Sequence, residues 1–139
     1  MTTAVDSSVL LAIINGEPGA DAWVRTLAQA RMESRLVLCG VVYAEWSPAL
    51  DSKLEFEDIL SRLGISFDPL RTEAAHLAGQ LFISYRRTGG PRQHLIPDFL
   101  IGAHALAQAD RLAATDRGFL RRYFPTLTLL LPALEQDGV

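Results

Sequence analysis

Short apolar runs that alternate with helical segments constrain this chain more than any other feature of its sequence. Each run has three to five residues, and together they give the predicted strands Thr2–Val5, Arg35–Cys39, Ile65–Phe67, Arg111–Ala114 and Leu127–Leu131. Buried strands as short as these, joined by helices, are typical of a parallel sheet with helices on both faces. The sequence therefore predicts a single α/β domain with three layers, α/β/α, around a short-stranded parallel sheet.

The segments between the predicted strands carry apolar residues at helical spacing. The predicted helices are Ser8–Ile14, Ala20–Arg31, Val41–Leu50, Lys53–Leu63, Thr72–Arg87, Asp98–Ala109 and Arg117–Tyr123. Gly64 is the expected C-terminal stop of one helix, and Thr88–His94 is an expected flexible stretch. With 139 residues, 49% of them apolar and 21% charged, the composition is that of an ordinary globular domain. This domain is expected to cover residues 1–134, followed by a tail at 135–139.

Several classes of protein are excluded by composition. The single cysteine, Cys39, excludes an internal disulfide framework and a cysteine zinc site, and it is expected to be a small buried residue. The first residues lack a basic segment and place Asp6 inside the apolar stretch, so they are not expected to be a signal peptide. No apolar run approaches ~18 residues, so no membrane span and a cytoplasmic location are expected.

Four acidic residues fall where an open α/β sheet gathers its ligands, at the carboxyl ends of the strands. Asp6 follows the first predicted strand and Asp116 follows the fourth. Asp98 begins the helix before the fourth strand, and Glu45 is placed by helical spacing on an apolar face. Taken singly, each aspartate could be a helix N-cap and Glu45 could pair with an arginine.

Taken together, the four carboxylates would repel one another unless a divalent cation neutralised them. Hard oxygen donors without histidine or cysteine at zinc spacing favour Mg²⁺, with Mn²⁺ as the substitute. The histidines His76, His94 and His104 show no ligand pattern and are expected to have structural or surface roles. A net charge of −3 gives no general basic field for nucleic acid, but an acidic site neutralised by metal is compatible with one. Such a site can hydrolyse a phosphodiester with an activated water and needs no separate nucleophile.

Four motifs, VDSSVLLA, VVYAEW, PDFLIGAHAL and ATDRGFLRRYFP, together resemble the PIN-domain ribonucleases over nearly the whole chain. The closest likeness is to VapC-type toxins of bacterial toxin–antitoxin pairs. The resemblance implies that Asp6, Glu45, Asp98 and Asp116 hold the metal, and that Ser8 supports the first acid. Many members carry a threonine two positions before the fourth acid. Here that position is Ala114 and the hydroxyl is at Thr115, and no fifth acid follows in DRGF.

The resemblance further implies a Mg²⁺-dependent endoribonuclease that is held in check by a protein antitoxin and that forms a homodimer. RNA contacts are expected from the stretch YRRTGGPRQH, which carries the rings of Tyr85 and His94 and the arginines Arg86, Arg87 and Arg92. A second basic group follows the fourth acid and consists of Arg117, Arg121 and Arg122.

Two aromatic-rich segments are expected to form a groove for an amphipathic helix of the antitoxin. The first, Glu17–Ala30, carries Trp23, Val24 and Leu27; the second, Val42–Ile59, carries Tyr43, Trp46, Leu54 and Phe56. Some of these side chains are also expected to belong to the core.

Other functions on the same fold class fit less well. A receiver-type phosphoacceptor domain needs an acidic pair and a late lysine, whereas the sole lysine, Lys53, lies mid-chain. A phosphatase with a D-x-D motif is excluded because residue 8, two positions after Asp6, is a serine. A structure-specific DNA nuclease fits less well because this chain has no insertions that could clamp DNA. A non-catalytic PIN-like binding protein and a PIN nuclease outside a toxin–antitoxin pair stay open at this point.

Overall fold

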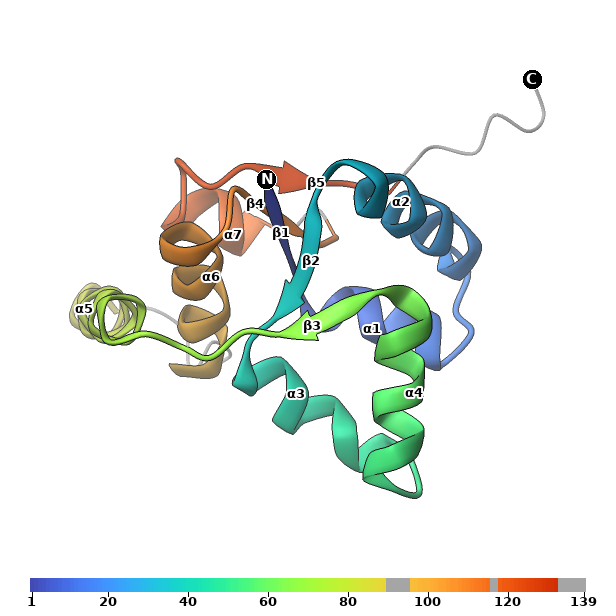
Figure 1. Ribbon diagram of the computed structural model, residues 1–139. Helices are drawn as coiled ribbons and strands as arrows, with labels where there is room; N and C mark the ends of the chain where they lie inside the picture. The colour runs from blue at the N-terminus through green and yellow to red at the C-terminus, as the bar shows by residue number, and fades with distance from the viewer. Residues whose placement is uncertain (90–95, 116–117, 133–139) are drawn as a thin grey trace.

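A five-stranded, all-parallel sheet forms the centre of the computed structural model, which describes residues 1–89, 96–115 and 118–132 (Figure 1). The strands are β1 (Thr2–Val5), β2 (Arg35–Leu38), β3 (Ile65–Phe67), β4 (Arg111–Ala113) and β5 (Leu129–Leu130). Their order is β3-β2-β1-β4-β5, so β1 is central, and Ala4 pairs with both Val37 and Leu112. The predicted α/β class and the single domain are confirmed. The predicted tail at 135–139 lies outside the described residues.

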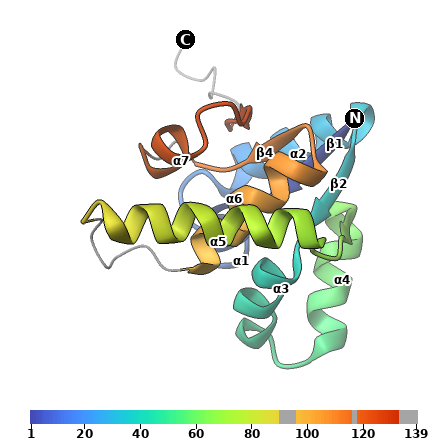
Figure 2. The same cartoon turned by 90° about the vertical axis from the view of Figure 1, so that its left-hand side faces the viewer.

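Helices cover both faces of the sheet. They are α1 (Ser7–Ile14), α2 (Ala20–Glu33), α3 (Gly40–Trp46), α4 (Lys53–Leu63), α5 (Thr72–Arg87), α6 (Ile96–Gln108) and α7 (Gly118–Tyr123), with one 3₁₀ turn at Ser47–Ala49. Helices α1 and α2 lie on one side, whereas α6 lies on the other, with α5 packed across it (Figures 1 and 2). Among the described residues no helix is long and apolar enough to cross a membrane.

Several predicted boundaries differ from those of the structure, and three of the differences have a local cause. The predicted helix Val41–Leu50 ends at Trp46 and tightens to 3₁₀, since Pro48 has no N–H for the helical ladder. Helix α6 begins earlier than predicted, at Ile96, because Pro97 is tolerated in a first turn. The last strand is shorter than predicted, since the amide of Leu127 donates to Phe124 O in a turn instead of pairing in the sheet.

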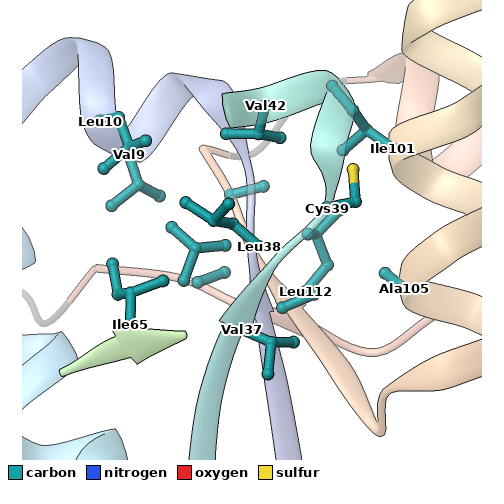
Figure 3. Packing of buried hydrophobic residues seen from close by; sticks show 14 of the residues in the cluster. Val9, Leu10, Val37, Leu38, Cys39, Val42, Ile65, Ile101, Ala105 and Leu112 are labelled. Atoms are coloured by element: carbon teal, nitrogen blue, oxygen red, sulfur yellow. The ribbon is translucent and has the colours of Figure 1, made fainter. Parts of the chain in front are cut away.

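The core fills both sides of the sheet. Val9 and Leu10 of α1 lie on one side of β2, and Ile101 and Ala105 of α6 lie on the other (Figure 3). All four are buried. Gly64 ends α4 with a φ of +76°, as the predicted stop requires.

The strand order fixes where a ligand can bind. From β1 the chain moves outward to β2 and β3, and it then returns to place β4 on the other side of β1. The carboxyl ends of β1 and β4 therefore form the point at which the strand order reverses, and ligands of open α/β sheets bind there.

Candidate active site

Asp6 lies at the carboxyl end of β1, and its side chain is 3% exposed. Its amide donates to Ala113 O of β4 at 2.9 Å. Its carboxylate caps helix α1: Oδ2 accepts from the Ser8 amide at 3.1 Å and from the Ser8 hydroxyl at 2.6 Å. The N-cap reading of Asp6 is therefore correct. It does not exclude a metal, because a carboxylate offers about four lone-pair sites.

Ser8 also connects the ends of two strands. Its Oγ accepts from the Thr115 amide at 3.2 Å while donating to Asp6. Thr115 thus binds Ser8 through its backbone amide, whereas the sequence had suggested a role for its hydroxyl. The contact fixes the chain just after β4 beside Asp6. The next residue, Asp116, lies outside the described residues.

Glu45 differs from its prediction. Its side chain is exposed on α3 instead of facing the apolar interior, because α3 is short and only Val42 of that helix is fully buried. None of the arginines that the structure describes pairs with Glu45. Its Oε1 instead accepts a 2.6 Å hydrogen bond from the hydroxyl of Ser7, the first residue of α1.

Ser7 was missed by the sequence analysis. The doubled serine in VDSSVLLA was the available signal, but only Ser8 matches the family pattern. Spacing along the chain could not pair Ser7 with a residue 38 positions away.

Asp98 lies in the first turn of α6, as its third residue, and is half-buried. It is therefore not the N-cap, and a carboxylate in this turn is stabilised by the helix dipole. Over the next two turns, Ile101, Gly102 and Ala105 are buried, as the predicted face requires. Helix α6 packs against both β1 and α3, so Asp98, Asp6 and Glu45 come from elements that touch one another.

The convergence of all four acids stays a prediction. In the described part of the chain, no three acidic, histidine or cysteine side chains form a group that could hold a metal ion. The chemistry of the donor set nevertheless fits Mg²⁺, since Asp6 and Glu45 offer carboxylate oxygens that are held by neutral hydroxyl donors. Cys39 is buried at the end of β2, and burial raises the pKa of its thiol, with the charge of Glu45 raising it further. A thiol with a raised pKa is a poor ligand, so Cys39 is the small buried residue expected.

The predicted RNA-contact stretch is only partly described. Tyr85 is 1% exposed and packs between Phe99 and Tyr123, at centroid distances of 5.3 and 5.2 Å. The expectation that Tyr85 stacks on RNA is therefore wrong, because its ring belongs to the core. Arg86 and Arg87 are exposed in the last turn of α5. Arg92, His94 and Arg117 lie outside the described residues.

Of the second basic group, Arg121 and Arg122 are exposed in the last turn of α7. The Arg122 guanidinium lies over the ring of Tyr123, at 5.4 Å from its centroid.

His104 has the structural role expected of it. Its side chain is buried, and Nε2 lies 2.8 Å from Asp68 Oδ2. Gln108 Nε2 donates to the same oxygen at 3.0 Å and to Pro69 O at 2.9 Å. These contacts tie the loop after β3 to α6, the helix that carries Asp98. His76 is exposed on α5.

Most of the predicted partner groove is core. Trp23, Leu27 and Phe56 are at most 2% exposed, and Tyr43 packs edge-on against Phe56. Trp23 and Leu27 lie on the buried face of α2 and Phe56 on that of α4, as amphipathic helices require. The other apolar residues of the two segments include Val24, 43% exposed, and Leu54, 81% exposed.

Comparisons with known proteins agree with this architecture. The family model for the PIN domain matches residues 3–125. Among solved structures, VapBC2 of Rickettsia felis, bound to a DNA fragment from its promoter, matches with a TM-score of 0.75 and 19% identity, over 96% of this chain and 100% of that one. VapBC-1 of nontypeable Haemophilus influenzae matches with a TM-score of 0.66 and 18% identity, over 94% and 97%.

DNA-bound VapBC of Salmonella typhimurium matches with a TM-score of 0.62 and 19% identity, over 94% of this chain and 98% of that one. At such identities these matches establish a shared fold. No curated protein matches the sequence.

Proposed function

This chain belongs to the PIN domain family, and from that membership we propose that it is a Mg²⁺-dependent endoribonuclease and the toxin of a toxin–antitoxin pair. The observation that supports this most is the bonding of Asp6. Its carboxylate is held at the switch point of the sheet by Ser8, and Ser8 in turn accepts from the Thr115 amide at the end of β4. A buried acid fixed at this place is what a metal-dependent hydrolase needs.

We assign the metal-holding role to Asp6, Glu45, Asp98 and Asp116. When bound, Mg²⁺ supplies a lowered pKa for an attacking water and positive charge for the phosphate oxygens. Ser8 keeps the Asp6 carboxylate oriented, because its hydroxyl donates to Oδ2. Thr115 fixes Ser8 through its amide, so the hydroxyl proton of Ser8 is directed at Asp6.

Arginines near the site are proposed to hold the RNA backbone. Arg86 and Arg87 end the helix that precedes α6, and α6 begins two residues before Asp98. Arg92 and Arg117 are proposed for the same role from their positions in the sequence. Guanidinium groups suit this role because they bind phosphate oxygens in pairs.

The solved neighbours are toxin–antitoxin complexes, and we propose that a cognate antitoxin binds this chain and that the chain forms a homodimer. Because Trp23, Leu27 and Phe56 are core residues, we confine the antitoxin surface to exposed apolar groups such as Val24 and Leu54. An amphipathic helix would bury these side chains against its own apolar face.

The catalytic proposal is tested by the amide variants of the four acids. Asp6→Asn, Glu45→Gln, Asp98→Asn and Asp116→Asn should each reduce Mg²⁺-dependent cleavage of RNA at least ~100-fold, because each removes charge from a hard-cation site. Asp58→Asn is the matched control, since Asp58 pairs with Arg62 on an exposed face of α4. Full activity in both the Asp98→Asn and Asp116→Asn variants would refute the nuclease proposal.

The antitoxin proposal is tested by co-expression with the product of the adjacent reading frame. Leu54→Glu should prevent complex formation without unfolding the chain, because this side chain is 81% exposed. Met32→Glu, at a residue 83% exposed near the end of α2, is the control and should leave the complex intact. A chain that is harmless when expressed alone and binds no such partner would contradict the toxin assignment and leave the nuclease site untouched.

A further inference from the structure

Two consecutive serines at the start of α1 hold carboxylates that come from different elements. Ser8 donates to Asp6, which ends β1, at 2.6 Å. Ser7 donates to Glu45, which lies on α3, also at 2.6 Å. We infer that Ser7 is a positioning residue that fixes Glu45 for metal binding, an inference that rests on the proposed function.

Glu45 needs such a partner more than Asp6 does. Asp6 is buried, with its carboxylate directed by the helix that it caps. Glu45 has a longer side chain, and it lies exposed to solvent at the penultimate position of a seven-residue helix. An exposed glutamate samples several rotamers, and confining it to one costs conformational entropy. The bond from Ser7 selects one orientation before a cation arrives.

The chemical type of the donor supports a role toward a cation. Two other surface carboxylates are held by guanidinium groups: Glu33 by Arg111 and Asp58 by Arg62, both at 2.9 Å. Such a partner cancels the charge that would attract a metal ion. A serine hydroxyl is neutral, so Glu45 is oriented while its full negative charge is retained. A carboxylate that accepts one hydrogen bond also keeps most of its lone-pair sites.

The position of Ser7 couples the two acids. Asp6, Ser7 and Ser8 are consecutive, so the start of α1 sets Asp6 and the anchor of Glu45 within a single turn. Removing the Ser7 hydroxyl leaves the bonds from Ser8 to Asp6 and from Thr115 to Ser8 in place. A Ser7 variant therefore tests Glu45 alone.

The test measures Mn²⁺ affinity by isothermal titration calorimetry on the RNA-free chain, with the thermal melting of the metal-free chain beside it. Ser7→Ala should weaken Mn²⁺ binding about ten-fold, the lower end of what loss of an orienting partner costs at metal sites. Ser7→Thr, which keeps the hydroxyl, should restore binding to within about two-fold. In a Glu45→Gln background, Ser7→Ala should have no further effect, because Ser7 acts through Glu45.

Tyr43→Phe is the matched control. The hydroxyl of Tyr43, on α3, donates to Glu57 of α4 at 2.8 Å. This pair is therefore also a neutral hydroxyl bound to a glutamate. This variant removes the same type of bond at a place outside the site, and it should leave Mn²⁺ affinity unchanged.

Each remaining outcome contradicts a distinct statement. If the wild-type chain binds no Mn²⁺, both the proposed function and the role of Ser7 are wrong. If the wild-type chain binds Mn²⁺ and cleaves RNA while Ser7→Ala binds as tightly, only the role of Ser7 is wrong. If Ser7→Ala lowers the melting temperature and weakens Mn²⁺ binding equally with and without Glu45, Ser7 stabilises α1 and does not position Glu45.

Discussion

Gly102 provides a direct test of how α6, the helix that carries Asp98, is held against its neighbours. A Cβ at this position would lie 2.5 Å from Cε2 and 2.6 Å from Cζ of Phe124. The Phe124 ring is 2% exposed and has the rings of Phe99 and Phe119 around it, at centroid distances of 6.4 and 6.3 Å. We therefore expect Gly102→Ala to be destabilising, although alanine is the better helix former.

The magnitude follows from two opposed effects. Alanine in place of glycine inside a helix is worth about 1 kcal/mol. Against this, ordinary van der Waals contact begins near 3.4 Å, whereas the new Cβ would lie 2.5 Å from the ring. Ring and helix must therefore separate by about 0.9 Å. Overpacking of this kind costs about 1–3 kcal/mol in a close-packed core. Since the clash involves a buried ring without room to turn, we expect a cost near the upper end and a net loss of about 1–2 kcal/mol. That loss corresponds to a melting temperature lower by roughly 3–7 °C for a domain of this size.

Gly79→Ala is the matched control. Gly79 is also inside a helix, α5, but a Cβ there would meet nothing within 4 Å. This variant should therefore stabilise the chain by up to about 1 kcal/mol. Urea unfolding of both variants measures the difference directly. A Gly102→Ala chain as stable as Gly79→Ala would show that α6 and α7 have more freedom than this packing allows, and the argument would be refuted.

Three further predictions concern charge, a buried polar contact and the thiol. Neutralising Arg86 and Arg87 together should weaken RNA binding. It should also reduce the slope of log K against log salt concentration by roughly 1.4, at about 0.7 per phosphate contact on a single strand. An unchanged slope in a filter-binding assay would show that neither arginine contacts RNA. Asp68→Ala leaves the buried His104 without its partner, so urea unfolding should show a loss of about 1–3 kcal/mol, and an unchanged midpoint would contradict this. Burial raises the pKa of the Cys39 thiol in the folded chain. The stability that the neutral thiol contributes should therefore be complete below the ordinary thiol pKa of about 8.5 and should decline as the pH rises above that value. Thermal melting of Cys39→Ser at several pH values provides the comparison, since this variant should lack the decline.

The sequence by itself determined the sheet and most of the helices. Lys53–Leu63, Thr72–Arg87 and Ile65–Phe67 were predicted with the boundaries that the structure shows. These segments were predictable because apolar periodicity and a C-terminal glycine are local signals. Such signals fix an element before it meets any neighbour.

The burial of individual side chains was decided only in the folded chain. Tyr85 was expected to contact RNA beside exposed arginines, yet it packs in the core between Phe99 and Tyr123. Glu45 seemed buried, yet it is exposed. Helical spacing tells which residues share a face but not how far that face extends under the neighbouring helix, since that depends on where the neighbour lies.

The candidate site shows the same division. The sequence indicated Asp6 by its place after the first strand, and Ser8 through the resemblance to PIN-domain ribonucleases. The bond between them is local, because a cap and its helix are neighbours along the chain. The bonds from Ser7 to Glu45 and from Thr115 to Ser8 join residues 38 and 107 positions apart. Such pairs exist only because parallel strands and their crossover helices bring the carboxyl ends of β2, β1 and β4 to one edge of the sheet, and no local rule in the sequence encodes that meeting.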